Sequence, residues 1–119
     1  MNVRPLVLIG IEDLLERTTI KDKLQKHYYI RSVARGIDII SSLAQEEFDL
    51  VILDTKIHTP DLCATLYGLS KLNPKQKVIV LKDTEGTNLP KCDCVKHWLD
   101  KDTKNTILEG LVYATINDI

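Results

Sequence analysis

Two cysteines and a histidine lie close together in the run Cys92-Asp93-Cys94-x-x-His97, and side chains of these types bind zinc. Two thiolates and one imidazole would supply three of the four ligands that a structural zinc site needs. No second Cys/His pair follows, and Cys63 belongs to a different segment. We therefore interpret this run as structural, without a metal. The sequence also has no Ser/His/Asp arrangement, phosphate-binding glycine loop or dinucleotide fingerprint, so it gives no sign of an enzyme.

Asp54 is a stronger candidate for a functional residue, because it ends the apolar run FDLVILD. In open α/β sheets, ligands bind at the carboxyl ends of the strands. Lys82 and Lys101 follow two other apolar runs, so in such a sheet both ammonium groups can reach Asp54. At roughly 4 Å and an effective dielectric of about 20, each pair is worth about 4 kcal/mol before desolvation. We expect a lysine to neutralise Asp54. The alternatives are a simple strand-end carboxylate and a solvated Lys82.

Five short apolar runs are candidates for the strands of this sheet. The runs 6–9, 48–54 and 77–81 are almost continuous in Val, Ile and Leu, which is typical of strands buried on both faces. The runs 29–34 and 95–99 complete the set. Segments with helical spacing separate them, so the pattern predicts βαβ units with right-handed crossovers. The result is an α/β fold with a doubly wound, mostly parallel sheet and helices on both faces.

The helical segments are marked by apolar spacing and by residues suited to helix ends. The first spans 13–26 and the last 103–116, while Pro60 and Asp61 suit the start of the third and Asn73 its end. The residues expected to face the core are Leu15, Ile20 and Leu24 in the first, Ile37, Ile40 and Leu43 in the second, Leu62, Leu66 and Leu69 in the third, and Ile107, Leu108, Leu111 and Tyr113 in the last.

One interval, 82–91, breaks the alternation of strands and helices. It holds Gly86 and Pro90 and has almost no apolar residue, so a helix there would lack a buried face and contain two breakers. We predict a loop or a single turn in its place.

The length and composition limit the classes of protein to which this chain can belong. The 119 residues fit one domain, 1–119, with a real hydrophobic core. The net charge of −1 and the 5% of aromatic residues give no electrostatic or stacking basis for nucleic-acid binding. The amino-terminal apolar run is soon broken by acidic residues, which fits neither a signal peptide nor a membrane span. Three cysteines do not suggest a disulfide framework, so we expect a cytoplasmic location.

The order of these segments resembles the response-regulator receiver domain, which has a flavodoxin-like fold. FDLVILD places Asp54 on the family's phosphoacceptor aspartate, and the residues after it fit the family except that His58 replaces the usual proline. NPKQKVIVL resembles the approach to the fourth strand. HWLDKDTKNTILEGL places Lys101 on the family's conserved lysine and Trp98 on its aromatic switch position. His58 itself has no identifiable partner, and we expect it to be solvated.

The departures from the family concern its phosphorylation chemistry. The two adjacent acids that hold Mg²⁺ in the family fall on Ile11 and Glu12, with Asp13 next. If Mg²⁺ binds at all, the resemblance implies Glu12, Asp13 and Asp54 as its ligands. Lys82 stands where the family has a Ser or Thr that contacts the phosphoryl group. Phosphoryl transfer to a carboxylate needs a hard cation with oxygen ligands, so a standard cycle is not expected.

The resemblance therefore implies an atypical receiver, or pseudo-receiver, that acts by protein–protein interaction in signalling, without catalysis and without a cofactor. Two alternatives stay open. One is a working two-component receiver phosphorylated on Asp54 with Mg²⁺. The other is a small flavodoxin-like ligand-binding or enzymatic module with a deep pocket at the strand ends.

We also expect a partner surface. Receivers associate through their fourth helix, fifth strand and last helix. Without the fourth helix, Trp98, Val95 and the last helix would form an exposed apolar patch. A homodimer or a protein partner would cover it. The alternative is that Trp98 packs inward.

Overall fold

A five-stranded parallel sheet forms the centre of the chain, with the strand order β2-β1-β3-β4-β5. The computed structural model describes residues 4–83 and 90–119. The strands are β1 (Leu6–Gly10), β2 (Tyr29–Val33), β3 (Leu50–Asp54), β4 (Val78–Lys82) and β5 (Val95–Asp100). All neighbouring strands pair in parallel. The expected five strands and doubly wound parallel sheet are therefore confirmed.

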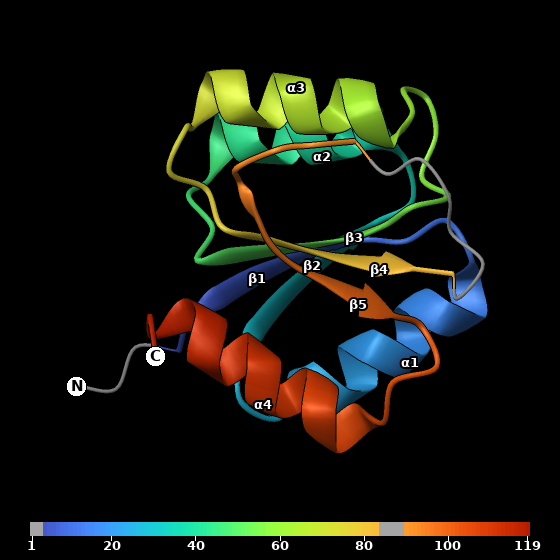
Figure 1. The fold of residues 1–119 in the computed structure, drawn as a ribbon, viewed down its shortest axis with the longest axis vertical. Coiled ribbons are helices and arrows are strands. Elements are labelled where there is room, and N and C mark those ends of the chain that lie inside the picture. Colours follow the sequence, from blue (N-terminus) through green and yellow to red (C-terminus); the bar gives the residue numbers. More distant parts are fainter. Residues whose placement is uncertain (1–3, 84–89) are drawn as a thin grey trace.

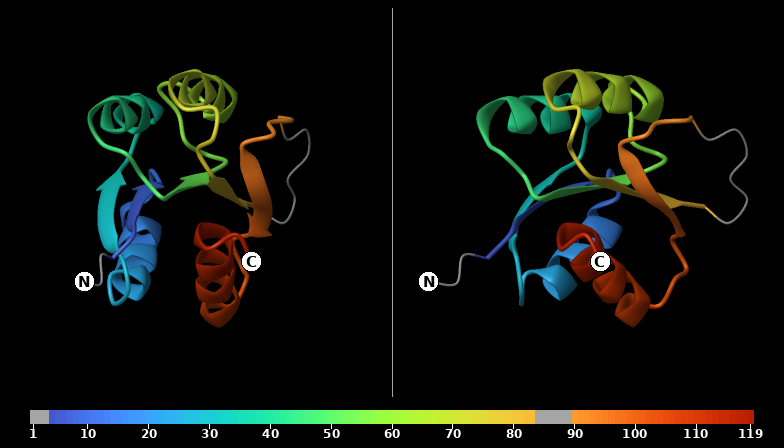
Figure 2. Two further views of the ribbon diagram at one scale, coloured as in Figure 1. Left: turned by 90° about the vertical axis from the view of Figure 1, so that its left-hand side faces the viewer. Right: turned by 60° about the vertical axis from the view of Figure 1, so that its left-hand side comes forward.

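Helices cover both faces of the sheet, as Figures 1 and 2 show. Helices α2 (Gly36–Gln45) and α3 (Leu62–Leu72) lie on one face, while α1 (Leu14–Leu24) and α4 (Asn105–Ile116) lie on the other. Right-handed crossovers between parallel strands place helices in these two layers. Among the residues that the structure describes, no helix is long and apolar enough to cross a membrane.

Two apolar clusters, one on each face, form the core. β3 contributes to both, because its successive side chains point to opposite faces and Leu50 to Leu53 are all fully buried. The cluster under α2 and α3 includes Val51, Leu53, Leu66, Leu69 and Val80. The cluster over α1 and α4 includes Val7, Ile9, Ile52, Leu108 and Val112. Burial of β3 on both faces explains its unbroken apolar sequence.

The third helix was predicted with the correct buried face. Leu62, Leu66 and Leu69 are buried, and Asp61 caps the helix by accepting a hydrogen bond from the Ala64 amide at 2.9 Å. This carboxylate satisfies one of the amides that an α-helix leaves free at its amino end.

The predicted inner faces of the other helices need correction. In α1 only Leu24 is buried, and Leu15 is 77% exposed. In α4, Leu108 is buried together with Val112, whereas Ile107 and Tyr113 are exposed. Ile37 of α2 is also exposed. In α2 and α4 the apolar residues extend around more of the helix than the side that contacts the sheet, whereas α1 has too few apolar residues to define a buried face.

No helix lies between β4 and β5 in the described part of the chain. Residues 83 and 90–92 have no regular structure, and a turn at 93–94 leads into β5. Residues 84–89, on which most of the loop prediction falls, lie outside the described residues. The described residues contain four helices.

Candidate functional site

Asp54 lies at the carboxyl end of the central strand β3 and is almost completely buried. Its Oδ1 accepts a hydrogen bond from the Lys56 amide at 2.8 Å. Its Oδ2 lies 2.8 Å from the ammonium of Lys101, just after β5. Each oxygen of this buried carboxylate therefore has a protein partner, as a buried charge requires.

Lys101 connects three carboxylates. Besides Asp54, its Nζ lies 3.3 Å from Asp83 Oδ1 and 3.8 Å from Glu16 Oε2. Its backbone amide also donates to the Lys82 carbonyl at 2.9 Å, which fixes the lysine at the edge of the sheet. Burial acts against the charge on Lys101. The hydrogen bond that Lys101 donates to Asp54 and the charges of Asp54 and Glu16 outweigh that effect, so the pKa of Lys101 is raised.

Lys82 does not reach Asp54, contrary to expectation. Its Nζ lies 2.6 Å from Asp100 Oδ1. Lys82 and Asp100 are register partners in the parallel pair of β4 and β5, so neighbouring strands hold the two side chains together. Lys101 is therefore the lysine that meets Asp54, and Lys82 forms a separate, more exposed pair.

Glu12 and Asp13 lie beside Asp54, in the connection between β1 and α1. Together with Glu16, Lys56, Asp54 and Lys101 they line a cavity of about 310 Å³. Glu12 Oε1 lies 2.8 Å from His58 Nε2. His58 therefore has a partner that the sequence did not identify, while its side chain is 55% exposed, as expected of a solvated histidine. Asp13 Oδ1 accepts a hydrogen bond from the Glu16 amide at 2.9 Å and caps α1.

Two members of this site, Glu16 and Asp83, were not identified from the sequence. Burial, together with the charges of Asp54 and Asp13, raises the pKa of Glu16 even though Lys101 acts in the opposite direction. Asp83 lies between two lysines, with Oδ2 at 3.5 Å from Lys56 Nζ. Loss of hydration would raise its pKa, but the hydrogen bond and charge of Lys101 and the charge of Lys56 lower it. One signal was available: Glu16 follows Asp13 by three residues, a spacing that places both in the first turn of a helix.

The donor set around Asp54 does not fit a metal ion. Ile11, at the end of β1, has an apolar side chain that is buried in the core. The nearby carboxylates of Glu12 and Asp13 are turned to His58 and to the start of α1. Among residues 4–83 and 90–119, no three His, Cys, Asp or Glu side chains are grouped so that they could hold one ion. A hard cation such as Mg²⁺ needs several oxygens directed at one point.

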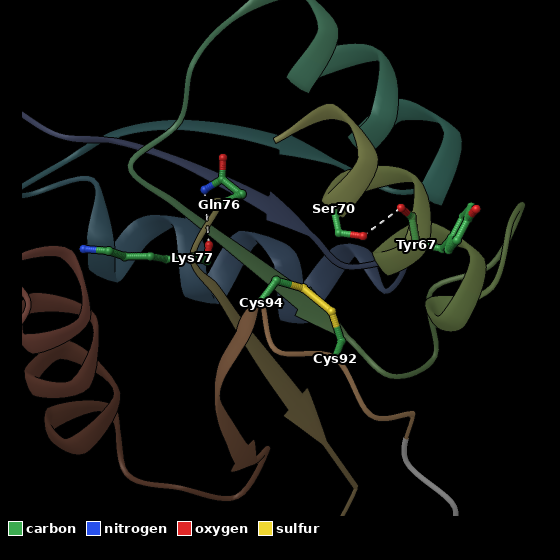
Figure 3. Close-up of a disulfide and its surroundings, with 6 residues drawn as sticks. All are labelled: Tyr67, Ser70, Gln76, Lys77, Cys92 and Cys94. Atoms are coloured by element: carbon green, nitrogen blue, oxygen red, sulfur yellow. Dashed lines mark hydrogen bonds between the residues drawn. A yellow bond between two sulfur atoms is a disulfide. The ribbon is translucent and has the colours of Figure 1, made fainter. Parts of the chain in front are cut away.

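The cysteines are also not available to a metal as the zinc motif would require. Cys92 and Cys94 form a disulfide next to the start of β5, and only Cys63 is free. Figure 3 shows this bond beside β5, with residues of α3 nearby. This single bond was not predicted from the sequence, whose three cysteines did not suggest a disulfide framework. A disulfide sulfur carries no thiolate charge, and the thiolate is the form that binds zinc.

Trp98 and the last helix do not form one patch. Trp98 and Val95 are partly buried and pack against the cluster under α2 and α3. Helix α4 lies on the other face of the sheet (Figure 2). Its exposed apolar side chains, Ile107 and Tyr113, are separated from Trp98 by β5 itself.

Three solved structures with the same architecture illustrate the likeness, and two of them are receiver domains. The receiver domain of a sensor histidine kinase from Pseudomonas aeruginosa, solved with magnesium coordinated in its active site cleft, is 18% identical, with a TM-score of 0.82 and coverage of 97% of this chain and 99% of that chain. The beryllofluoride-activated DrrB receiver domain is 17% identical, with a TM-score of 0.79 and coverage of 97% and 99%. An adenylate cyclase from Rhodopirellula baltica is 12% identical, with a TM-score of 0.83 and coverage of 97% and 89%.

No family model matches the sequence, and no curated protein matches it. At 12–18% identity the structural likeness establishes the fold and nothing finer. The chain has the doubly wound, CheY-like flavodoxin fold of response-regulator receiver domains.

Proposed function

We propose that this domain is an atypical receiver, a pseudo-receiver, that works in cytoplasmic signal transduction by protein–protein contact and without a phosphorylation cycle. The observation that supports this best is the lack of a three-ligand cation site in the described residues around Asp54. Lys101 supplies the positive charge beside this carboxylate instead, at 2.8 Å.

Phosphoryl transfer to a carboxylate has strict electrostatic requirements. Charge that develops on the transferring group has to be neutralised by cations at fixed positions. Here an apolar side chain, Ile11, stands at the end of β1. Lys82, at the end of β4, is engaged with Asp100. The acceptor oxygens of Asp54 are themselves bound by Lys56 and Lys101.

Incubation with Mg²⁺ and either beryllofluoride or acetyl phosphate tests this proposal. We expect no gain in intact mass and no change in the fluorescence of Trp98, the only tryptophan. The DrrB receiver domain, which has a beryllofluoride-activated structure, is the positive control for the reagent.

A mass gain that disappears in Asp54→Ala would overturn the proposal and support a phosphoacceptor receiver. Asp49→Ala is the matched control, because Asp49 lies in the same chain segment at the opposite end of β3. Its Oδ2 accepts a hydrogen bond from the Leu6 amide at 2.8 Å, away from the cavity.

Partner binding is the positive side of the proposal. We infer that β5 and α4 carry the contact surface for a second copy or another protein. Ile107 and Tyr113 are the large apolar side chains that α4 leaves exposed. Burying two such side chains removes apolar surface from water. This contributes about 25 cal/mol of favourable free energy per Å², before the cost of ordering the groups.

Sedimentation and thermal melts of Trp98→Ala, compared with Ile107→Ala, assess this surface. We expect Ile107→Ala to weaken association while leaving the melt unchanged, because its side chain is exposed. Trp98→Ala should lower the melt as well, since this ring packs against the core. Unchanged association in both variants, or a chain that is monomeric at all concentrations and captures no partner, would contradict this surface.

A further inference from the structure

We propose that the cavity between the carboxyl ends of α1 and α4 binds a small organic cation. This cavity has a volume of about 650 Å³ and is lined by Pro5, Leu24, Tyr28, Glu109, Gly110 and Tyr113, among others. Pro5 precedes β1, so the cavity lies at the amino ends of the strands, opposite Asp54. Figure 1 shows the two helices side by side under the sheet. The site is therefore independent of the proposed receiver chemistry.

Tyr28 is the first observation that points to a ligand. Its side chain is only 8% exposed, yet its hydroxyl has no hydrogen-bond partner among the residues that the structure describes. Among the described residues, only Gln76 has a side-chain N or O atom that is both fully buried and without a partner. The unpartnered Tyr28 oxygen is therefore not fully buried. Tyr28 lines the cavity and its hydroxyl is not sealed from solvent, so a ligand or water can reach it there. Buried tyrosine hydroxyls normally have a partner.

The second observation is the charge on the cavity wall. Glu109 is partly buried and forms no ion pair with any described residue. Its carboxylate and the Tyr113 phenol lie close enough to Tyr28 to act on it: burial first, then Tyr113 and Glu109, raises the pKa of Tyr28. Three oxygen-bearing groups therefore converge on one space, and the formal charge among them is the negative charge of Glu109.

The aromatic faces complete the chemistry. The rings of Tyr28 and His27 meet edge to face, with centroids 6.3 Å apart, and Tyr113 contributes a further ring from α4. Tyrosine rings attract ammonium groups that lie over their faces, and such rings around a carboxylate are the setting in which alkylammonium ligands are bound. An anion would be repelled by Glu109 and by the negative ring faces. The ligand should therefore carry a positive charge.

Gly110 is the third observation. It lies in the interior of α4, where glycine is less favourable than alanine. A Cβ atom at this position would meet nothing within 4 Å, so close packing does not explain the glycine. Its absent side chain leaves the wall of the cavity open. The volume falls within the range of small-molecule sites, which suits an ammonium group attached to a compact apolar body.

Choline and its neutral isostere 3,3-dimethylbutan-1-ol test the proposal in NMR titrations of the full chain. We expect choline to shift the amide signals of His27, Tyr28 and Glu109 saturably, and the isostere to bind about tenfold more weakly. Glu109→Gln should weaken choline binding about tenfold as well. Glu47→Gln, which changes an exposed glutamate away from the cavity, is the matched control and should bind choline as the unaltered chain does.

Gly110→Leu gives a second test, because the new side chain would enter open space and block the cavity without a clash. We expect a folded protein that no longer binds choline. Equal binding of choline and its isostere, or full affinity in Glu109→Gln, would overturn the proposal. So would the lack of a saturable shift up to about 10 mM choline, at which a site with a Kd of about 1 mM would be roughly 90% filled. None of these outcomes depends on whether Asp54 is phosphorylated.

Discussion

Replacing Lys101 by methionine should destabilise the protein strongly, because it leaves the Asp54 carboxylate buried without its counter-charge. Asp54 is 3% exposed, and the two charged groups lie 2.8 Å apart. At an effective dielectric of about 20, this separation corresponds to about 6 kcal/mol of attraction before desolvation. Desolvation offsets part of it, and removing one partner of a buried pair typically costs 3–5 kcal/mol. The Lys101 side chain is 16% exposed, so we expect about 3 kcal/mol.

Lys82→Met is the matched control for this experiment. Lys82 and Asp100 are closer, at 2.6 Å, but their side chains are 25% and 41% exposed. Solvent screens such a pair, and its loss should cost less than about 1 kcal/mol. The comparison therefore separates burial from distance: the longer ion pair should matter more.

Urea unfolding at pH 7, followed by the fluorescence of Trp98, measures these free energies. Asp54→Asn completes a double-mutant cycle with Lys101→Met, and we expect a coupling free energy of about 2 kcal/mol. The asparagine retains an acceptor for the Lys56 amide, so its own cost should be about 1 kcal/mol. If Lys101→Met destabilised the protein no more than Lys82→Met, the account of Asp54 as a neutralised, buried carboxylate would be refuted.

Further expectations concern pH, helix α4 and the cysteines. The pKa of Lys101 is raised in the folded state, so its charge stabilises the folded protein. This stabilisation is complete below the unfolded pKa of about 10.4 and is lost as the pH rises through the folded pKa. Urea unfolding midpoints at alkaline pH should show the loss, and Lys101→Met should abolish it. Gly110→Ala should raise the free energy of unfolding by about 0.5–1 kcal/mol, because alanine is the better helix former and its Cβ meets nothing. Gly36→Ala should lower the free energy of unfolding, because the new Cβ would collide with backbone and side-chain atoms. A higher melting temperature for Gly36→Ala would contradict this account. Alkylation under denaturing conditions should modify Cys63 alone before reduction and all three cysteines after it, and mass spectrometry would reveal any other count.

The strands were predictable because their burial leaves a local trace. A strand covered on both faces has to be apolar at every position, and β3 is, from Leu50 to Leu53. Helix phase was less predictable where a helix is apolar on several sides. α4 has Ile107 and Leu108 in adjacent positions, and only contact with the sheet determines that Leu108 faces inward. In α1 the apolar residues are too few to define a face, and Leu15 is exposed.

The candidate site was predictable to the extent that it follows from strand ends. Asp54 ends β3 and Lys101 follows β5, so the parallel order alone brings them to one edge of the sheet. The partner of Lys82 could not be foreseen, because it depends on the register between β4 and β5. The Glu12–His58 contact joins two separate connections, whose paths depend on the whole fold.

The strand order has a consequence for how this molecule can associate. β2 and β5 lie at the two edges of the sheet, and edge strands are where another chain could add a strand and start aggregation. β2 carries Arg31 at its centre, exposed and paired with Glu46, and β5 carries the exposed Lys96 and His97. Charged side chains on an edge oppose strand addition. Any specific assembly of this protein should therefore use side-chain contacts of its helices and of β5, and the sheet should stay at five strands.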